Sequence, residues 1–303
     1  MHYRKRIIFP GDGNFQNLSD LDPPKKNGIR IHVILFLATV LTTTAVGSFM
    51  SGHNPFSGFD IIYGFPFSLT LLTILGVHEF AHYFAARKWN IDVTLPYFIP
   101  APFIPIGTFG AVIRMKSSIP NRKALVDVGA SGPIAGFIVA VIASISGLYL
   151  SEVKEVISTG SEPFMTLGES LIFKFMSYLV IGPLPENFDV YLHPVAFAGW
   201  IGLFVTALNL IPVGQLDGGH VLFALSPRIH EMIRKIRIPI LLLMGMTFWE
   251  GWYVWAVLSL MFGRNHPYPN RMEYSVGPVR TGFALAALII FILCMTPTPI
   301  MVG

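Results

Sequence analysis

Long apolar stretches alternate along this chain with polar segments rich in proline and glycine. Six apolar stretches are predicted to be helical: about 31–50, 61–86, 124–150, 194–211, 238–262 and 283–301. A helix needs about 20 apolar residues to cross a bilayer, and these stretches have lengths of that order. The pattern therefore predicts an all-α polytopic membrane protein with about six transmembrane helices.

The segment between the second and third stretches departs from this pattern. Residues 96–120 are irregular and rich in proline, which excludes a lipid-facing helix. Gly107–Ile113 within this segment contains strand-forming residues, to which an unwound substrate could add by backbone pairing. A membrane-dipping loop that only fills the core is an equally good interpretation. We expect a short membrane-associated strand or loop region here, and an amphipathic piece at 167–181.

Composition supports a membrane protein and excludes several functions. The chain is 53% hydrophobic and 13% charged, whereas soluble domains carry roughly 25% charged residues. The net charge of +4 forms no basic stripe interleaved with aromatic residues, so nucleic acid is not an expected partner. Cys294 is the single cysteine, which excludes an intrachain disulfide and a thiolate metal cluster.

The distribution of Lys and Arg predicts the orientation. Basic residues dominate the N-terminal tail and the segments after the second and fourth stretches, whereas acidic residues dominate after the third. This places the N-terminus in the cytosol. The fifth stretch has two interpretations: one crossing puts Arg264, Arg271 and Arg280 outside, and a hairpin at Glu250–Gly251 keeps them inside. Each half of the hairpin has about 12 residues, too few to span, so a single crossing is the prediction.

The second stretch contains the sequence His78-Glu79-Phe80-Ala81-His82. On a helix, positions i and i+4 share one face, so both imidazoles can bind one ion, with Glu79 beside it as general base for the attacking water. In a soluble helix such a match is as often coincidence as function. Ionisable residues inside a membrane span are costly and usually functional. We therefore predict that His78 and His82 are ligands of a catalytic Zn2+.

A catalytic zinc takes three protein ligands, and Asp217 is the best candidate for the third. Pro212 and Gly214 break the fourth helix before it, and Gly218-Gly219 allow a tight turn after it. Broken backbone at membrane depth is tolerated where it lines an enclosed cavity. Asp217 is also a candidate N-cap for a helix at 218–225, and the two roles are compatible.

Several other polar or small residues have plainer interpretations. Asp127 is expected at a helix start or in support of a ligand, and Gly129, Gly132 and Gly136 are expected to allow close helix packing. Three further histidines adjoin turn residues and are expected to be solvated or capping: His193, His220 and His266. His220 is the nearest of them to the predicted site.

HEFAH, taken with the downstream NLIPVGQLDGG of Asn209–Gly219, resembles the site-2 protease family of intramembrane zinc metalloproteases. The Gly107–Phe137 segment resembles the family core, and the likeness covers about 64–225. The resemblance implies one Zn2+ per chain, held by His78, His82 and Asp217. It also implies that Glu79 is the catalytic acid/base and that Asn209 holds or polarises the substrate peptide.

The same resemblance implies hydrolysis of peptide bonds within or near transmembrane segments of membrane-protein substrates, as in regulated intramembrane proteolysis. Residues 1–28 would form a cytosolic tail. Residues 29–303 would form the membrane-embedded metalloprotease domain, with a core at about 61–226 and a site opening toward the cytosol. The expected partners are a substrate with a transmembrane segment and the lipid bilayer, and the oligomeric state is not indicated. The alternative is a metal or proton transporter with buried His, Glu and Asp, which predicts polar residues spread over several spans rather than clustered in two motifs.

Overall fold

The computed structural model describes residues 28–155, 165–185, 187–262, 269–272 and 275–302. The predicted N-terminal tail, Arg264 and His266 lie outside these residues. In the described part, three helices are long and apolar enough to cross a membrane: α1 (Ile29–Met50), α2 (Phe65–Lys88, continuous with the 3-10 turn η2, Asp60–Gly64) and α3 (Arg122–Tyr149). Shorter helices include α4 (Leu171–Val180), α5 (Pro194–Asn209), α6 (Asp217–Leu225) and α9 (Pro278–Cys294). The chain is therefore a membrane protein, whereas the count of six crossings stays a prediction.

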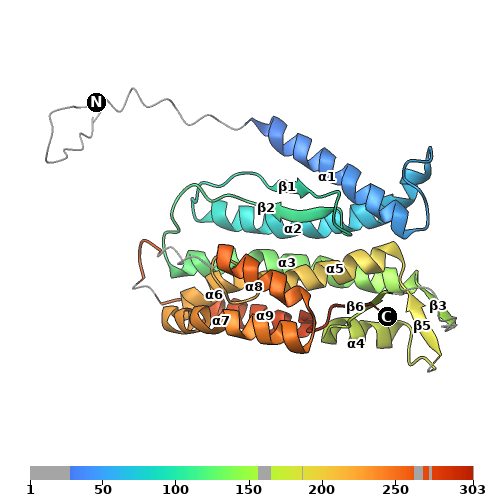
Figure 1. The fold of residues 1–303 in the computed structure, drawn as a ribbon. Helices are drawn as coiled ribbons and strands as arrows, with labels where there is room; N and C mark the ends of the chain where they lie inside the picture. The colour runs from blue at the N-terminus through green and yellow to red at the C-terminus, as the bar shows by residue number, and fades with distance from the viewer. Residues whose placement is uncertain (1–27, 156–164, 186, 263–268, 273–274, 303) are drawn as a thin grey trace, which may run out of the picture.

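Helix α3 is the centre of the helical bundle. It packs against α2, α5, α6 and α9, and Figure 1 shows it lying between α2 and the C-terminal helices. Asn121 is its N-cap, with a side chain that accepts a hydrogen bond from the Ala124 amide at 2.9 Å. Where α3 meets α5, small residues face each other: Gly147 lies against Ala196, and Gly199 lies against Ser144. These residues permit close approach of α3 and α5. The close packing predicted at Gly129, Gly132 and Gly136 is confirmed on α6 and α2, where these glycines lie against His220, His82 and His78 respectively.

The irregular segment before α3 contains a β-hairpin. Strands β1 (Tyr97–Pro100) and β2 (Thr108–Val112) pair antiparallel, with Tyr97 opposite Val112. The hairpin packs against α1 and α2. Of the two interpretations of Gly107–Ile113, the strand is confirmed. The expectation of a wholly helical protein misses two further small sheets, in which β3 (Glu152–Glu155) pairs with β5 (Phe188–Tyr191) and β4 (Met165–Leu167) pairs with β6 (Ile300–Val302).

The predicted single crossing at 238–262 is wrong. Helix α7 (Pro227–Thr247) ends before a break at 248–250, and α8 (Gly251–Phe262) returns along it. Their antiparallel contact is fixed by a hydrogen bond from Arg237 Nε to Ser259 Oγ at 2.9 Å and by Gly245, which lies against the Tyr253 ring. The hairpin therefore turns at Glu250–Gly251, where apolar residues of the two helices pack together, among them Leu241, Trp252 and Ala256.

This hairpin also changes the position expected for the last arginines. Arg280, in the first turn of α9, pairs with Asp127 near the start of α3. The Arg271 amide bonds to the Pro120 carbonyl just before α3 at 3.1 Å. Both arginines therefore lie at the end of the bundle where α2 ends and α3 begins, and their predicted separation from the basic Arg87–Lys88 end is wrong.

Candidate metal centre

Helix α2 places two imidazoles and a carboxylate inside the bundle. His78, Glu79 and His82 are all buried, although each would be well hydrated on an exposed helix. His78 and His82 stand one turn apart, with their rings edge to face and 4.7 Å between centroids. The i, i+4 spacing predicts that the two imidazoles lie on one face of the helix, and this is confirmed.

Asp217 reaches the same place from a break in the chain. Helix α5 ends at Asn209, and the turn that follows has Gly214 at a positive φ of 57°. Asp217 is the first residue of α6, and Leu216 is the N-cap, so the alternative interpretation of Asp217 as the N-cap is wrong. A Cβ at Gly218 or Gly219 would overlap backbone carbonyls of 210–214. The two glycines thus allow the tight turn that presents Asp217, as the sequence predicted.

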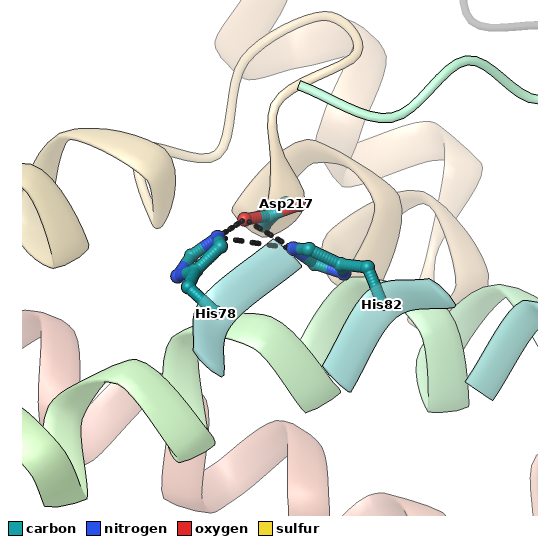
Figure 2. Close-up of side chains that lie close together, drawn as sticks. All are labelled: His78, His82 and Asp217. Carbon is teal, nitrogen blue, oxygen red and sulfur yellow. Dashed lines mark hydrogen bonds and ion pairs between the residues drawn. The ribbon is translucent and has the colours of Figure 1, made fainter. Parts of the chain in front are cut away.

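The side chains of His78, His82 and Asp217 converge on one point (Figure 2). His82 Nε2 lies 3.0 Å from His78 Nε2 and 3.2 Å from Asp217 Oδ2. His78 Nε2 lies 3.3 Å from the same carboxylate oxygen. Among the described residues these form the one cluster of three potential metal ligands.

The hydrogen bonding of His82 determines which of its ring nitrogens faces the cluster. Its Nδ1 lies 2.7 Å from the backbone carbonyl of Val128 in α3. Because a carbonyl can only accept, Nδ1 carries a proton, and Nε2 is the ring nitrogen that faces the cluster, where it can serve as a metal ligand. This nitrogen lies 3.2 Å from the Asp217 carboxylate. A cation between the two would be bound by both groups.

The spacing of the three atoms suits a tetrahedral ion. Bonds of about 2.0–2.1 Å to nitrogen or oxygen, directed to the corners of a tetrahedron, hold the ligand atoms about 3.3 Å apart. The three observed separations, 3.0, 3.2 and 3.3 Å, are close to this value. Two imidazoles with one carboxylate also form a ligand type used in catalytic zinc sites, which leave the fourth position to water or substrate.

Two more predicted residues lie beside the cluster. Asn209 is the last residue of α5, and its Nδ2 lies 3.5 Å from His78 Nε2. The Glu79 carboxylate lies near the backbone amide of Ile113, the residue that follows β2. The structure thus brings together all five residues singled out in the sequence, and it sets strand β2 beside Glu79.

The remaining polar candidates stand apart from the cluster. His193 is the N-cap of α5 and accepts from the Val195 amide at 3.2 Å, which confirms its capping role. His220 is buried in α6 and lies against Gly129, so a solvated position for it is wrong. Asp127 accepts hydrogen bonds from Trp89 and Arg280 and is not one of the clustered ligands.

Several supporting residues have no signal in the sequence. The Val128 carbonyl is a backbone group, and Arg280 lies far from both motifs in the chain. Arg122 donates to the carbonyls of Ala224 at 2.5 Å and Leu225 at 2.7 Å, which are the last of α6. These contacts depend on which helices are neighbours, and periodicity does not supply that information.

Comparison with known proteins decides the family. The profile described as Peptidase family M50 matches residues 66–249, a range that includes both motifs and more than half of the chain. The chain belongs to peptidase family M50. This is the site-2 protease family that the two motifs resemble.

Curated relatives of this M50 chain come from plants. "Probable zinc metalloprotease EGY2, chloroplastic" of Oryza sativa subsp. indica is 33% identical over 216 residues, which are 71% of this chain and 38% of that protein. The Arabidopsis thaliana protein of the same description is 30% identical over 241 residues, covering 78% and 42% respectively. "Probable zinc metalloprotease EGY1, chloroplastic" of Arabidopsis thaliana is 31% identical over 246 residues, covering 77% and 42%.

The M50 chain therefore spans about two fifths of the length of these relatives. None of the solved structures gives a significant match to it.

Proposed function

We propose that this M50 protein is an intramembrane zinc metalloprotease that hydrolyses peptide bonds within or near transmembrane segments of other membrane proteins. The observation that carries the proposal is the tetrahedral spacing of His78, His82 and Asp217, buried among helices of membrane-spanning length, with Glu79 next to the first ligand. The names of the plant relatives support zinc as the ion.

Each residue has a distinct role in the proposed reaction. His78, His82 and Asp217 hold the Zn2+, which when bound lowers the pKa of a water and polarises the substrate carbonyl. Glu79 takes a proton from the attacking water and returns it to the departing amine. Asn209 donates to the substrate carbonyl, whose oxygen gains charge as the water attacks. Burial excludes bulk water, which strengthens these interactions.

The substrate would bind as an added strand along β2. A peptide bond in a membrane helix is already internally hydrogen-bonded and must unwind before it can react. Within the described residues β2 pairs with β1 alone, so its second edge has backbone groups to offer. Because β2 packs against α2 and Ile113, which follows β2, lies near Glu79, a peptide paired with that edge would place one of its carbonyls near the site.

The site would open toward the cytosol. Basic residues gather where α2 ends and α3 begins, at Arg87, Lys88, Arg122 and Lys123, and such clusters remain on the cytosolic side. His82 precedes Arg87 by five positions, roughly 7 Å at the helical rise.

We propose 29–303 as the membrane-embedded protease domain, with the substrate and the bilayer as its partners.

Cleavage of a reporter transmembrane segment by wild type and by Glu79→Gln tests the proposal. We expect the variant to lose activity by about 10²-fold or more, the usual contribution of a general base, while it retains zinc. Glu155→Gln is the matched control, since Glu155 lies exposed on β3. Equal cleavage by Glu79→Gln and wild type would exclude the mechanism.

A further inference from the structure

A polar cluster of three side chains joins α2, α3 and α9 next to the proposed metal site. Asp127 of α3 receives two hydrogen bonds from Arg280 of α9, Nε to Oδ1 and Nη2 to Oδ2, each 2.9 Å long. It also accepts from Trp89 Nε1 at 2.9 Å. The guanidinium lies 5.5 Å from the centre of the Trp89 ring. We name Asp127, Arg280 and Trp89 the α9 clamp.

The clamp is well protected from solvent for a charged pair. The side chain of Asp127 is 13% exposed and that of Arg280 is 25% exposed. A bidentate guanidinium–carboxylate pair fixes orientation as well as distance, because its two hydrogen bonds are parallel. It therefore constrains α9 against α3 more tightly than a single-point contact would.

The clamp adjoins the group that orients a proposed ligand. Val128, which follows Asp127 in α3, directs its carbonyl to His82 Nδ1 at 2.7 Å. Helix α2 is thereby tied to α3 at two levels, through His82 to Val128 and through its C-cap residue Trp89 to Asp127. A shift in the first turns of α3 would move both ties together.

We propose that Arg280 is a positioning residue for the metal site. It holds Asp127, and with it the start of α3, where the Val128 carbonyl keeps His82 in the tautomer that directs Nε2 at the ion. This inference rests on the proposed zinc site and extends it to a helix that supplies no ligand. Loss of such supporting contacts typically weakens metal binding about 10–100-fold.

The test is the rate at which zinc leaves the purified full-length protein when a chelator is added. We expect Arg280→Gln to release zinc about 10-fold faster than wild type. Arg280→Lys keeps the charge but loses the two-pronged geometry, and its rate should lie between the two. Arg234→Gln is the control, because Arg234 makes a similar bidentate pair with Glu231 on α7, at 2.7 and 2.5 Å. Its release rate should match wild type.

Two further measurements separate positioning from simple stabilisation. The visible absorption of the Co2+-substituted protein reports the geometry of the ligands, and we expect it to change in Arg280→Gln and to be unchanged in Arg234→Gln. The midpoint of thermal unfolding of the metal-free protein reports helix packing alone. A lower midpoint with wild-type zinc release and a wild-type Co2+ spectrum would overturn the inference.

Asp127→Asn keeps the inference testable if Arg280→Gln does not fold. This variant retains an acceptor for Trp89 and removes the charge that Arg280 needs, so faster zinc release is again expected. Wild-type zinc release by Asp127→Asn and Arg280→Lys together would overturn the clamp and leave the proposed function standing. A wild-type protein that binds no zinc would instead overturn the proposed function, and this inference with it.

Discussion

Gly132 of α3 lies directly against the imidazole of His82 of α2. A Cβ built at Gly132 would overlap three atoms of the ring, Nε2 among them. One turn further along α3, a Cβ at Gly136 would lie 3.0 Å from His78 Nδ1. The glycine face of α3 is therefore the wall against which both predicted histidine ligands rest, in addition to being a surface for helix packing.

Gly132→Ala is expected to weaken zinc binding by at least about 10-fold. The added methyl group would displace the His82 ring, which the Val128 carbonyl holds in its present orientation. Competition with a zinc chelator measures this affinity. Gly282→Ala is the matched control, since a Cβ added at Gly282 of α9 would have no atoms within 4 Å of it. Wild-type affinity in Gly132→Ala would contradict the close contact.

Gly136→Ala should also weaken zinc binding, but by less than Gly132→Ala. Its Cβ would make tight contacts of 3.0–3.5 Å with His78, which a shift of a few tenths of an ångström relieves. We expect zinc affinity between that of wild type and Gly132→Ala in the same competition assay. An effect larger than that of Gly132→Ala would show that His78 has less freedom to move than His82.

Asp217→Ala is expected to leave the protein with little zinc, because two imidazoles alone make an incomplete site. Metal content per chain after purification measures this, and Asp189→Ala on the surface strand β5 is the control. Chelation of the wild type should abolish cleavage, and added Zn2+ should restore it. Full zinc occupancy in Asp217→Ala would remove Asp217 from the ligand set.

Arg122→Gln is expected to destabilise the protein by about 2 kcal/mol, since two hydrogen bonds from a charged donor to the α6 carbonyls are lost. The same donor complements the negative end of the α6 dipole. Because α6 begins at Asp217, zinc release should also be faster. Chemical unfolding in detergent measures the first effect. Stability equal to that of Arg234→Gln would show that α6 is held by other contacts.

A photoreactive phenylalanine at Phe109 of β2 should crosslink to the substrate in the Glu79→Gln background. The Phe109 side chain is 70% exposed beside the strand edge. Phe56 is 84% exposed in the turn between α1 and η2, outside the β1–β2 hairpin, and crosslinking there should be weak. Equal capture at both positions would argue against strand addition on β2.

The chemistry of the site is local in the sequence, and this is why it could be predicted. The i, i+4 spacing of His78 and His82 needs only a helix to bring the imidazoles together, and an apolar stretch of this length can be little else. Asp217 is marked by helix breakers on both sides and by its likeness to a family motif. The residue types at Gly107–Ile113 allowed a strand or a loop equally, and the structure decided for the strand β2.

Tertiary structure decided the features that depend on which helices are neighbours. The α7–α8 hairpin could not be derived from the length of the apolar stretch, because it depends on how the two helices pack on each other. The same is true of Arg280, which is far from Asp127 in the chain and meets it only because α9 returns to α3. The sequence by itself indicated which side chains could bind a metal and react, since these lie on single helices or turns. The folded bundle decided how they are held, because glycine contacts, a backbone carbonyl and an ion pair act only once α2, α3, α6 and α9 are side by side.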